Sequence, residues 1–198
     1  MRKALYSLCL LWPVLFYAGQ QPVDYVDPFI CTQDDHGHWL PAALVPFGLI
    51  ELCPDSYPSS LTGDGDWAHS GYNYRDAAVR GFSHLHKGSS GGTAIYDRAG
   101  LLSFMPVPEA VADSFYINPV LQMDKSSEQA QAGYYGVNLE QGQIKVELTA
   151  TAHTGSHRYT FASGQSAKLF IFAGNRSRAQ NFSCRQLDDK TLAGVLTT

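Results

Sequence analysis

The stretch that decides the fold is IKVELTATAHTGSHRYTF, residues 144–161. Its first eight residues alternate apolar and polar side chains, with Ile144, Val146, Leu148 and Ala150 set against Lys145, Glu147, Thr149 and Thr151. Successive side chains of a β-strand point to opposite faces of the sheet. This period of two therefore predicts a strand with one buried face and one solvated face.

Further short runs rich in Tyr, Val, Ile, Thr and Phe surround this stretch, and they predict strands at residues 101–107, 133–139, 143–152, 157–161 and 168–173. An apolar run at 43–52, bounded by Pro41 and Pro54, is predicted as another short strand. Gln141-Gly142 stands between two of the runs and is typical of a hairpin turn. Strands joined by short turns predict an all-β protein, an antiparallel β-sandwich.

Residues 55–68 are dense in Ser, Gly, Pro and Asp, which predicts a long loop. Long ordered loops in compact domains are usually functional. Asp64, Asp66 and Trp67 within this loop are therefore candidate functional residues.

The first 20 residues have the three parts of a secretory signal peptide. Arg2 and Lys3 precede an apolar run at 4–17, and small or polar residues follow around Ala18. A membrane anchor is the competing interpretation, but the run contains Pro13 and is shorter than the roughly 20 apolar residues that a spanning helix needs. We expect a secreted or periplasmic protein with a mature domain at 21–198 and no membrane attachment after cleavage.

The formal net charge of −4 bears on the choice of partner. Nucleic acids and anionic membranes are bound by clustered Lys and Arg, which an acidic chain does not favour. We therefore expect no nucleic-acid partner. Neutral, hydroxyl-rich ligands fit better.

The cysteines leave two interpretations open. Cleavage of the leader would remove Cys9 and leave Cys31, Cys53 and Cys184. One disulfide between Cys31 and Cys53 with one free thiol is possible, but three buried apolar cysteines are slightly favoured. No CxxC spacing is present, so a thiolate zinc site is not expected.

The region 25–92 mixes aromatic with acidic and histidine side chains on a backbone rich in Gly and Pro. The mixture includes Trp39, Trp67, Tyr72, Tyr74, Asp35, His36, Asp66, His84 and His86. Aromatic rings stack on the apolar face of a pyranose, while carboxylates and imidazoles bind its hydroxyls. Composition alone supports equally the interpretation that these aromatic side chains fill the core and contact no ligand.

Two His-x-His pairs, at 36–38 and at 84–86, could together form a histidine-rich zinc site. Histidines that hold loops through hydrogen bonds, or that bind ligand hydroxyls, are the stronger interpretation because no paired Cys ligand accompanies them.

Seven short sequence motifs, in this order along the chain, resemble those of one known family. They are DPFI at 27–30, HGH at 36–38, VPFG at 45–48, CPD at 53–55, DW at 66–67, SGYNY at 70–74 and GFSHLH at 81–86. The GYY motif at 133–135 and the stretch 144–161 also fit. Together they resemble the amino-terminal domain of glycoside hydrolase family 92, whose members are calcium-dependent, inverting exo-α-mannosidases.

The resemblance implies a galactose-mutarotase-like supersandwich fold and mannose-containing glycans as ligands. In the family both catalytic carboxylates, and most of the calcium site, belong to a helical domain that follows the sandwich. The chain therefore looks incomplete at its C-terminus and lacks that helical partner. We expect no catalytic residue, no calcium bound by this chain alone and no mannosidase activity from it.

Carried onto matching positions, Trp67 would stack on the sugar in the leaving-group subsite with Asp66 beside it. The loop bearing His84 and His86 would face the same cleft, and Asp35 and His36 complete the predicted substrate-binding set. No metal ligand is assigned.

The chain departs from the family pattern at two glycines. Ile30-Cys31-Thr32-Gln33-Asp34 replaces the usual Ile-Gly-Thr-Gly-Gly, and Leu40-Pro41-Ala42 replaces Phe-Pro-Gly. Cys31 and Ala42 cannot adopt positive φ without strain. The lost glycines favour altered specificity or a pseudoenzyme as alternatives to a domain that contributes to a composite active site. A free-standing carbohydrate-binding sandwich without catalysis is a separate alternative.

Overall fold

The structure, a computed structural model, describes residues 20–33, 39–57, 70–86, 100–107, 119–140, 143–174 and 181–197. One turn of 3₁₀ helix, η1 (Pro22–Tyr25), precedes ten strands. These are β1 (Cys53–Tyr57), β2 (Ala78–Leu85), β3 (Leu101–Val107), β4 (Leu121–Gln131), β5 (Tyr134–Leu139), β6 (Ile144–Ala150), β7 (Gly155–Phe161), β8 (Lys168–Gly174), β9 (Asn181–Asp188) and β10 (Thr191–Thr197). The predicted all-β, antiparallel fold is confirmed.

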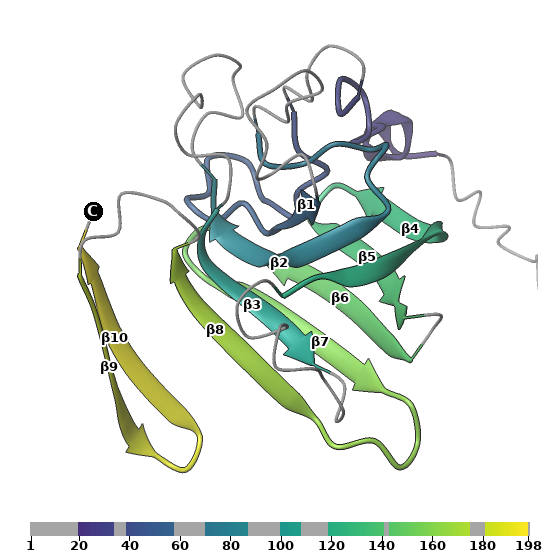
Figure 1. Cartoon of the computed structure of the whole chain (residues 1–198). Helices are drawn as coiled ribbons and strands as arrows, with labels where there is room; N and C mark the ends of the chain where they lie inside the picture. The colour runs from purple at the N-terminus through teal and green to yellow at the C-terminus, as the bar shows by residue number, and fades with distance from the viewer. Residues whose placement is uncertain are drawn as a thin grey trace, which may run out of the picture.

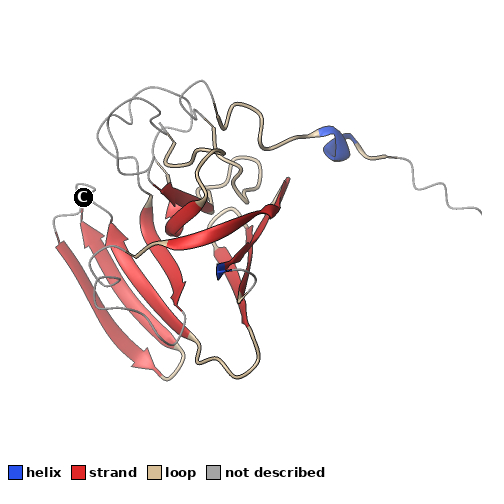
Figure 2. Ribbon diagram, turned by 45° about the vertical axis from the view of Figure 1, so that its right-hand side comes forward, coloured by secondary structure: helices blue, strands red, loops and turns tan. Residues whose placement is uncertain are grey.

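Eight strands form one antiparallel sheet in the order β7-β6-β5-β4-β2-β3-β8, with β1 paired to β2. The sheet has two halves, which join where Ala78 and Val79 of β2 pair with Gln122 and Leu121 of β4. The sheet curls on itself at this junction, so that the halves enclose the core as a sandwich (Figures 1 and 2). Across the core, the rings of Phe82 and Tyr159 lie 6.4 Å apart.

The alternation in β6 determines which side chains fill that core. Ile144, Val146 and Leu148 are almost completely buried among apolar residues of both halves, whereas Lys145 and Thr149 are exposed. The neighbouring β5 follows the same rule, because Tyr135, Val137 and Leu139 are buried. The strand predicted from this stretch is thus confirmed, with its wet face outward.

Strand predictions at 101–107, 133–139, 157–161 and 168–173 are confirmed as β3, β5, β7 and β8. The prediction of a strand at 43–52 is wrong. Ala43 and Leu52 form an isolated antiparallel bridge, and the chain turns between them. The predicted loop at 55–68 begins too early, because β1 continues to Tyr57. Residues 1–19, 58–69 and 141–142 lie outside the described residues, so the leader, most of that loop and the hairpin turn stay predictions.

The hairpin β9–β10 forms a two-stranded sheet of its own beside β8 (Figure 1). An apolar groove of about 440 Å³ lies between it and the β3–β8 face. Leu102, Phe104 and Ile171 line one side of the groove, and Phe182 and Leu192 the other.

All three cysteines downstream of the leader are free thiols, so Cys31 and Cys53 form no disulfide. Cys53 is fully buried, as expected of an apolar core residue. Cys31 and Cys184 are exposed, which corrects the expectation of three buried cysteines.

Candidate functional site

The carboxylate of Asp55 in β1 joins the residues on both sides of the segment 87–99. His86, directly before that segment, places Nε2 3.2 Å from Oδ1 of Asp55, and Gly100, directly after it, donates its backbone N–H to the same oxygen at 2.8 Å. The hydroxyls of Ser83 and Ser103 donate to Oδ2. A single buried carboxylate thus fixes both ends of this segment.

His86 has acceptors at both ring nitrogens. Nδ1 lies 3.0 Å from the carbonyl oxygen of Glu51, and Nε2 faces Asp55. The ring therefore bridges the Glu51 backbone and the Asp55 carboxylate. Its side chain is 1% exposed, so His86 in this arrangement holds β1 and the Glu51 backbone together, and its contact with sugar stays a prediction.

His84 lies inside strand β2, not in a loop as the sequence predicted. Its Nδ1 is 3.2 Å from the carbonyl oxygen of Leu102, and its ring packs 5.0 Å from Phe104 and 4.8 Å from His157. Burial lowers the pKa of His84, because desolvation disfavours the charged ring. The half-buried ring therefore favours the neutral form, which can accept as well as donate a hydrogen bond.

Tyr72 is a core residue, which agrees with the alternative that the aromatic side chains of region 25–92 fill the core. It is fully buried, and its hydroxyl donates to Oε1 of Glu128 at 2.6 Å, as does that of Tyr135. Burial raises the pKa of Tyr72 far above its usual range. Lys125 pairs with Glu128 and lies 4.3 Å from the centre of the Tyr74 ring, so one cation ties the buried tyrosines to the half-exposed Tyr74.

Residues that flank two further undescribed segments, 34–38 and 58–69, are hydrogen-bonded to one another. Ser70 donates from its hydroxyl to the carbonyl oxygen of Trp39 at 3.1 Å, and Trp39 donates its backbone N–H to Cys31 at 3.3 Å. Ser56 of β1 donates its N–H to the carbonyl oxygen of Gly71. The residues that flank the segments 34–38, 58–69 and 87–99 are therefore linked to one another or to β1 by hydrogen bonds.

Four predicted contact residues, Trp67, Asp66, Asp35 and His36, lie within these segments and outside the described residues. The structure thus places the residues that flank them and leaves their contacts as predictions. Sequence reasoning missed Asp55 as the organising residue, although the CPD motif contained it. Asp55 stands at the start of a stretch that the sequence predicts as a loop, so its burial was not expected, and a buried carboxylate requires internal partners.

At the first lost glycine the backbone keeps the conformation that favours glycine. Cys31 has a φ of 62°, in the left-handed region where a Cβ costs energy. Ala42 is not among the described residues with positive φ, so the same argument does not apply to it. The expected strain is therefore real at Cys31 alone, next to the segment that holds Asp35 and His36.

The described residues do not fit a calcium or zinc site. Among them, no group of three or more His, Cys, Asp or Glu side chains could hold a metal ion. Asp55, a fully buried carboxylate in this region, already accepts hydrogen bonds from four donors. The zinc hypothesis also involves His36 and His38, which lie outside the described part.

The sequence model of the glycosyl hydrolase family 92 N-terminal domain matches residues 25–198. The chain belongs to this family. The family 92 assignment inferred from the seven sequence motifs is thereby confirmed. Among curated proteins, an uncharacterized secreted glycosidase of Arthroderma benhamiae is 28% identical to it over 145 residues, which are 69% of this chain and 17% of that protein.

Solved family 92 structures share the fold. The α-mannosidase BT3965 of Bacteroides thetaiotaomicron, in complex with mannoimidazole, superposes with a TM-score of 0.70 at 28% identity over 87% of this chain and 22% of that enzyme. The family 92 hydrolase ccman5 has a TM-score of 0.70 at 24% identity, over 88% of this chain and 24% of its own. The chain thus spans less than a quarter of these relatives. Across its described residues it has no helix long and apolar enough to cross a membrane.

Proposed function

We propose that this chain is the N-terminal domain of a secreted α-mannosidase that removes terminal α-linked mannose from glycans with inversion. The family match over residues 25–198 carries this proposal. The similarity to a solved α-mannosidase supports the substrate class, and the relative named a secreted glycosidase supports export. The leader pattern at 1–20 supports export independently.

In this proposal the chain contributes a wall of a composite active site. Trp67 stacks on the sugar with Asp66 beside it, and Asp35 and His36 supply hydrogen bonds from the neighbouring segment. The hydrogen bonds that link the flanking residues to one another or to β1 support this arrangement, because they bring the origins of both segments together. His84 and His86 act behind the wall, by holding strands and the ends of 87–99.

Catalysis is assigned to a helical domain outside this chain. Inverting hydrolysis needs an acid and a base whose carboxyl groups are roughly 6.5–9.5 Å apart, on opposite faces of the scissile bond. Asp55 and Glu128 are buried and engaged by internal donors, so neither suits these roles. Calcium, on which the family depends, is likewise assigned to the partner domain.

Calorimetric titration of the chain with mannose and α-mannobiose tests whether Trp67 contacts the sugar. We expect binding that Trp67→Ala abolishes and Trp67→Phe partly retains, because the phenyl ring keeps a stacking surface. Unfolding curves of both variants check that the fold is intact. Binding that Trp67→Ala leaves unchanged would contradict the assigned role of Trp67.

The same titration separates the composite site from a free-standing binding module. If the folded chain binds no sugar, the site requires the helical domain, and the longer protein should then lose kcat/KM for α-mannobiose when Trp67 is changed to Ala. N-terminal sequencing of the exported protein should find residue 20 or 21 first.

A further inference from the structure

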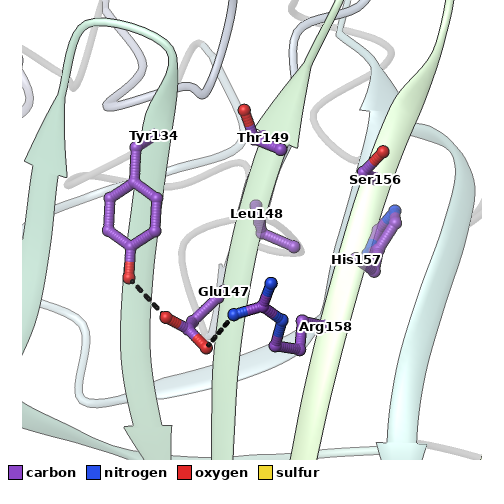
Figure 3. A pocket seen from close by; sticks show the side chains of 7 residues that line it. All are labelled: Tyr134, Glu147, Leu148, Thr149, Ser156, His157 and Arg158. Carbon is purple, nitrogen blue, oxygen red and sulfur yellow. Dashed lines mark hydrogen bonds and ion pairs between the residues drawn. The ribbon is translucent and has the colours of Figure 1, made fainter.

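The ring of Tyr134 lies flat on the outer face of the sheet, over Gly136 of the same strand. A Cβ atom placed on Gly136 would stand 2.7 Å from the Tyr134 hydroxyl oxygen and 3.1 Å and 3.2 Å from two ring carbons. Figure 3 shows the ring face-on along β5, parallel to the sheet. A glycine inside a strand often marks such a close approach, and here Gly136 leaves space for the Tyr134 ring to pack against the backbone.

A carboxylate on the adjacent strand holds the ring in this position. Glu147 of β6 pairs with Gly136 in the sheet register, and its Oε1 accepts the Tyr134 hydroxyl proton at 3.2 Å. Lys145 reaches the same oxygen at 3.1 Å, and Arg158 of β7 approaches Oε2 at 3.6 Å (Figure 3). The aromatic surface is thus fixed before any ligand arrives, which reduces the ordering cost of binding.

A hollow of about 370 Å³ adjoins this ring. Thr149, Ser156 and Arg158 are among the residues that line it, so hydroxyl groups and a guanidinium border the aromatic surface (Figure 3). The volume is at the lower end of the range for small-molecule sites, which runs from about 300 to 1,000 Å³. Tyr134, Glu147, Thr149, Ser156 and Arg158 line it from the outward faces of β5, β6 and β7, whereas Leu148 and His157, which also line it, belong to the core side.

We propose that this outer face of β5, β6 and β7 is a second carbohydrate-binding platform, on which a neutral sugar residue of a glycan stacks against Tyr134. Glu147 and Arg158 bind the sugar hydroxyls, since a carboxylate accepts and a guanidinium donates. Glu147 offsets only one of the two positive charges of Lys145 and Arg158, so binding of an anion is the competing outcome that inorganic phosphate tests. An aromatic body with polar groups at its edge matches a pyranose, which has an apolar face and a hydroxyl rim.

Such a platform would anchor a branched glycan beside the catalytic unit. A ligand held at two points is bound more tightly than at either one, because the second contact becomes intramolecular. The choice of a mannose-containing ligand rests on the proposed function, whereas the platform geometry does not.

Amide chemical-shift mapping of the full chain with mannotriose tests the platform. We expect shifts at the backbone amides of β5, β6 and β7, and affinity there roughly two- to tenfold weaker in Tyr134→Ala. Tyr134→Phe, which keeps the ring, should retain most of the affinity. Gly136→Ala should weaken binding without removing any polar group, because it lifts the ring. Tyr25→Ala, at an exposed tyrosine of η1, is the matched control and should bind as the unaltered chain does.

The spectrum of the unaltered chain decides the question even if Tyr134→Ala does not fold. The absence of shifts on β5, β6 and β7 would overturn the platform, as would unchanged binding by folded Tyr134→Ala or the same shifts produced by inorganic phosphate. Trp67→Ala should leave these shifts in place. Failure of the Trp67 site alone would therefore count against the proposed function and not against the platform.

Discussion

Asp55 and His86 are in contact inside the sandwich: Nε2 of His86 lies 3.2 Å from Oδ1 of Asp55, and the two side chains are 1% or less exposed. Removing one partner of a buried hydrogen bond leaves the other polar group unsatisfied, which costs more than the bond itself contributes. The pair also connects β1 to the end of β2, so its loss affects the candidate site directly.

Asp55→Asn should lower the free energy of unfolding by about 3 kcal/mol, because the amide cannot accept all four hydrogen bonds and leaves His86 unpaired. Urea unfolding measures the change. Asp189→Asn, at an exposed turn residue, is the control and should shift the value by less than about 0.5 kcal/mol. Equal effects of the two substitutions would show that Asp55 is not the organising residue.

Glu128→Gln should also destabilise the fold, by about 3 kcal/mol, because Glu128 accepts from Tyr72 and Tyr135 and pairs with Lys125. Glutamine can keep the two hydroxyl bonds but turns its amide toward the lysine ammonium. Glu140→Gln is the control, at a partly buried carboxylate whose hydrogen bond from the Gln122 N–H the amide oxygen can keep. A thermal midpoint that is the same for both variants would contradict this account.

Cys31→Gly should stabilise the chain by about 1 kcal/mol, because glycine adopts a φ of 62° without the Cβ strain. Cys31→Ala removes the exposed thiol but keeps the Cβ, so its stability should stay close to that of the unaltered chain. Thermal unfolding of both variants under reducing conditions distinguishes strain from thiol chemistry. Equal stabilisation by both would assign the effect to the thiol.

His157 should make the free energy of unfolding decrease as the pH is lowered. Burial lowers its pKa to about 3, below the usual value near 6.5 that applies in the unfolded chain. Between these values the unfolded chain binds the proton and the folded chain does not. The contribution is therefore fully present above about pH 6.5, and it is lost as the pH falls toward 3.

His157→Phe removes this titration, so its unfolding free energy should decline less between pH 6.5 and 3 than that of the unaltered chain. His84, whose ring lies 4.8 Å away and whose pKa is also lowered by burial, acts in the same direction and is unchanged in the comparison. His153→Gln, which removes an exposed histidine before β7, is the control for the loss of a histidine as such. Parallel profiles for all three proteins would contradict the role of His157.

Sequence alone predicted β3, β5, β6, β7 and β8 and did not predict β2, β4 or β9. The alternation around Val146 predicted β6 because one face is wet. Strand β2 was missed because it is buried on both faces and still carries Arg80, Ser83 and His84, which find internal partners. Such partners come from distant parts of the chain, and a local pattern does not contain them.

Only part of the candidate site was predicted from the sequence, again because contacts between distant parts of the chain leave no local pattern. The family motifs identified the segments, but the links between their flanking residues depend on hydrogen bonds such as Ser70 to Trp39, across 31 positions of sequence. The strain at Cys31 was predictable, because a residue with a Cβ stands where the pattern has glycine. Gly136 gave no comparable signal, since its role depends on where the Tyr134 ring lies.

The attachment of His86 and Gly100 to one carboxylate oxygen has a consequence for how this domain can diverge. Once both ends of a chain segment are anchored, lengthening it costs little conformational entropy, about 0.6 kcal/mol for each doubling. The residues between the two anchors can therefore be replaced or extended by evolution while the sandwich below keeps its stability. Asp55 therefore marks the boundary between the strands on which the fold depends and a segment whose length the fold tolerates.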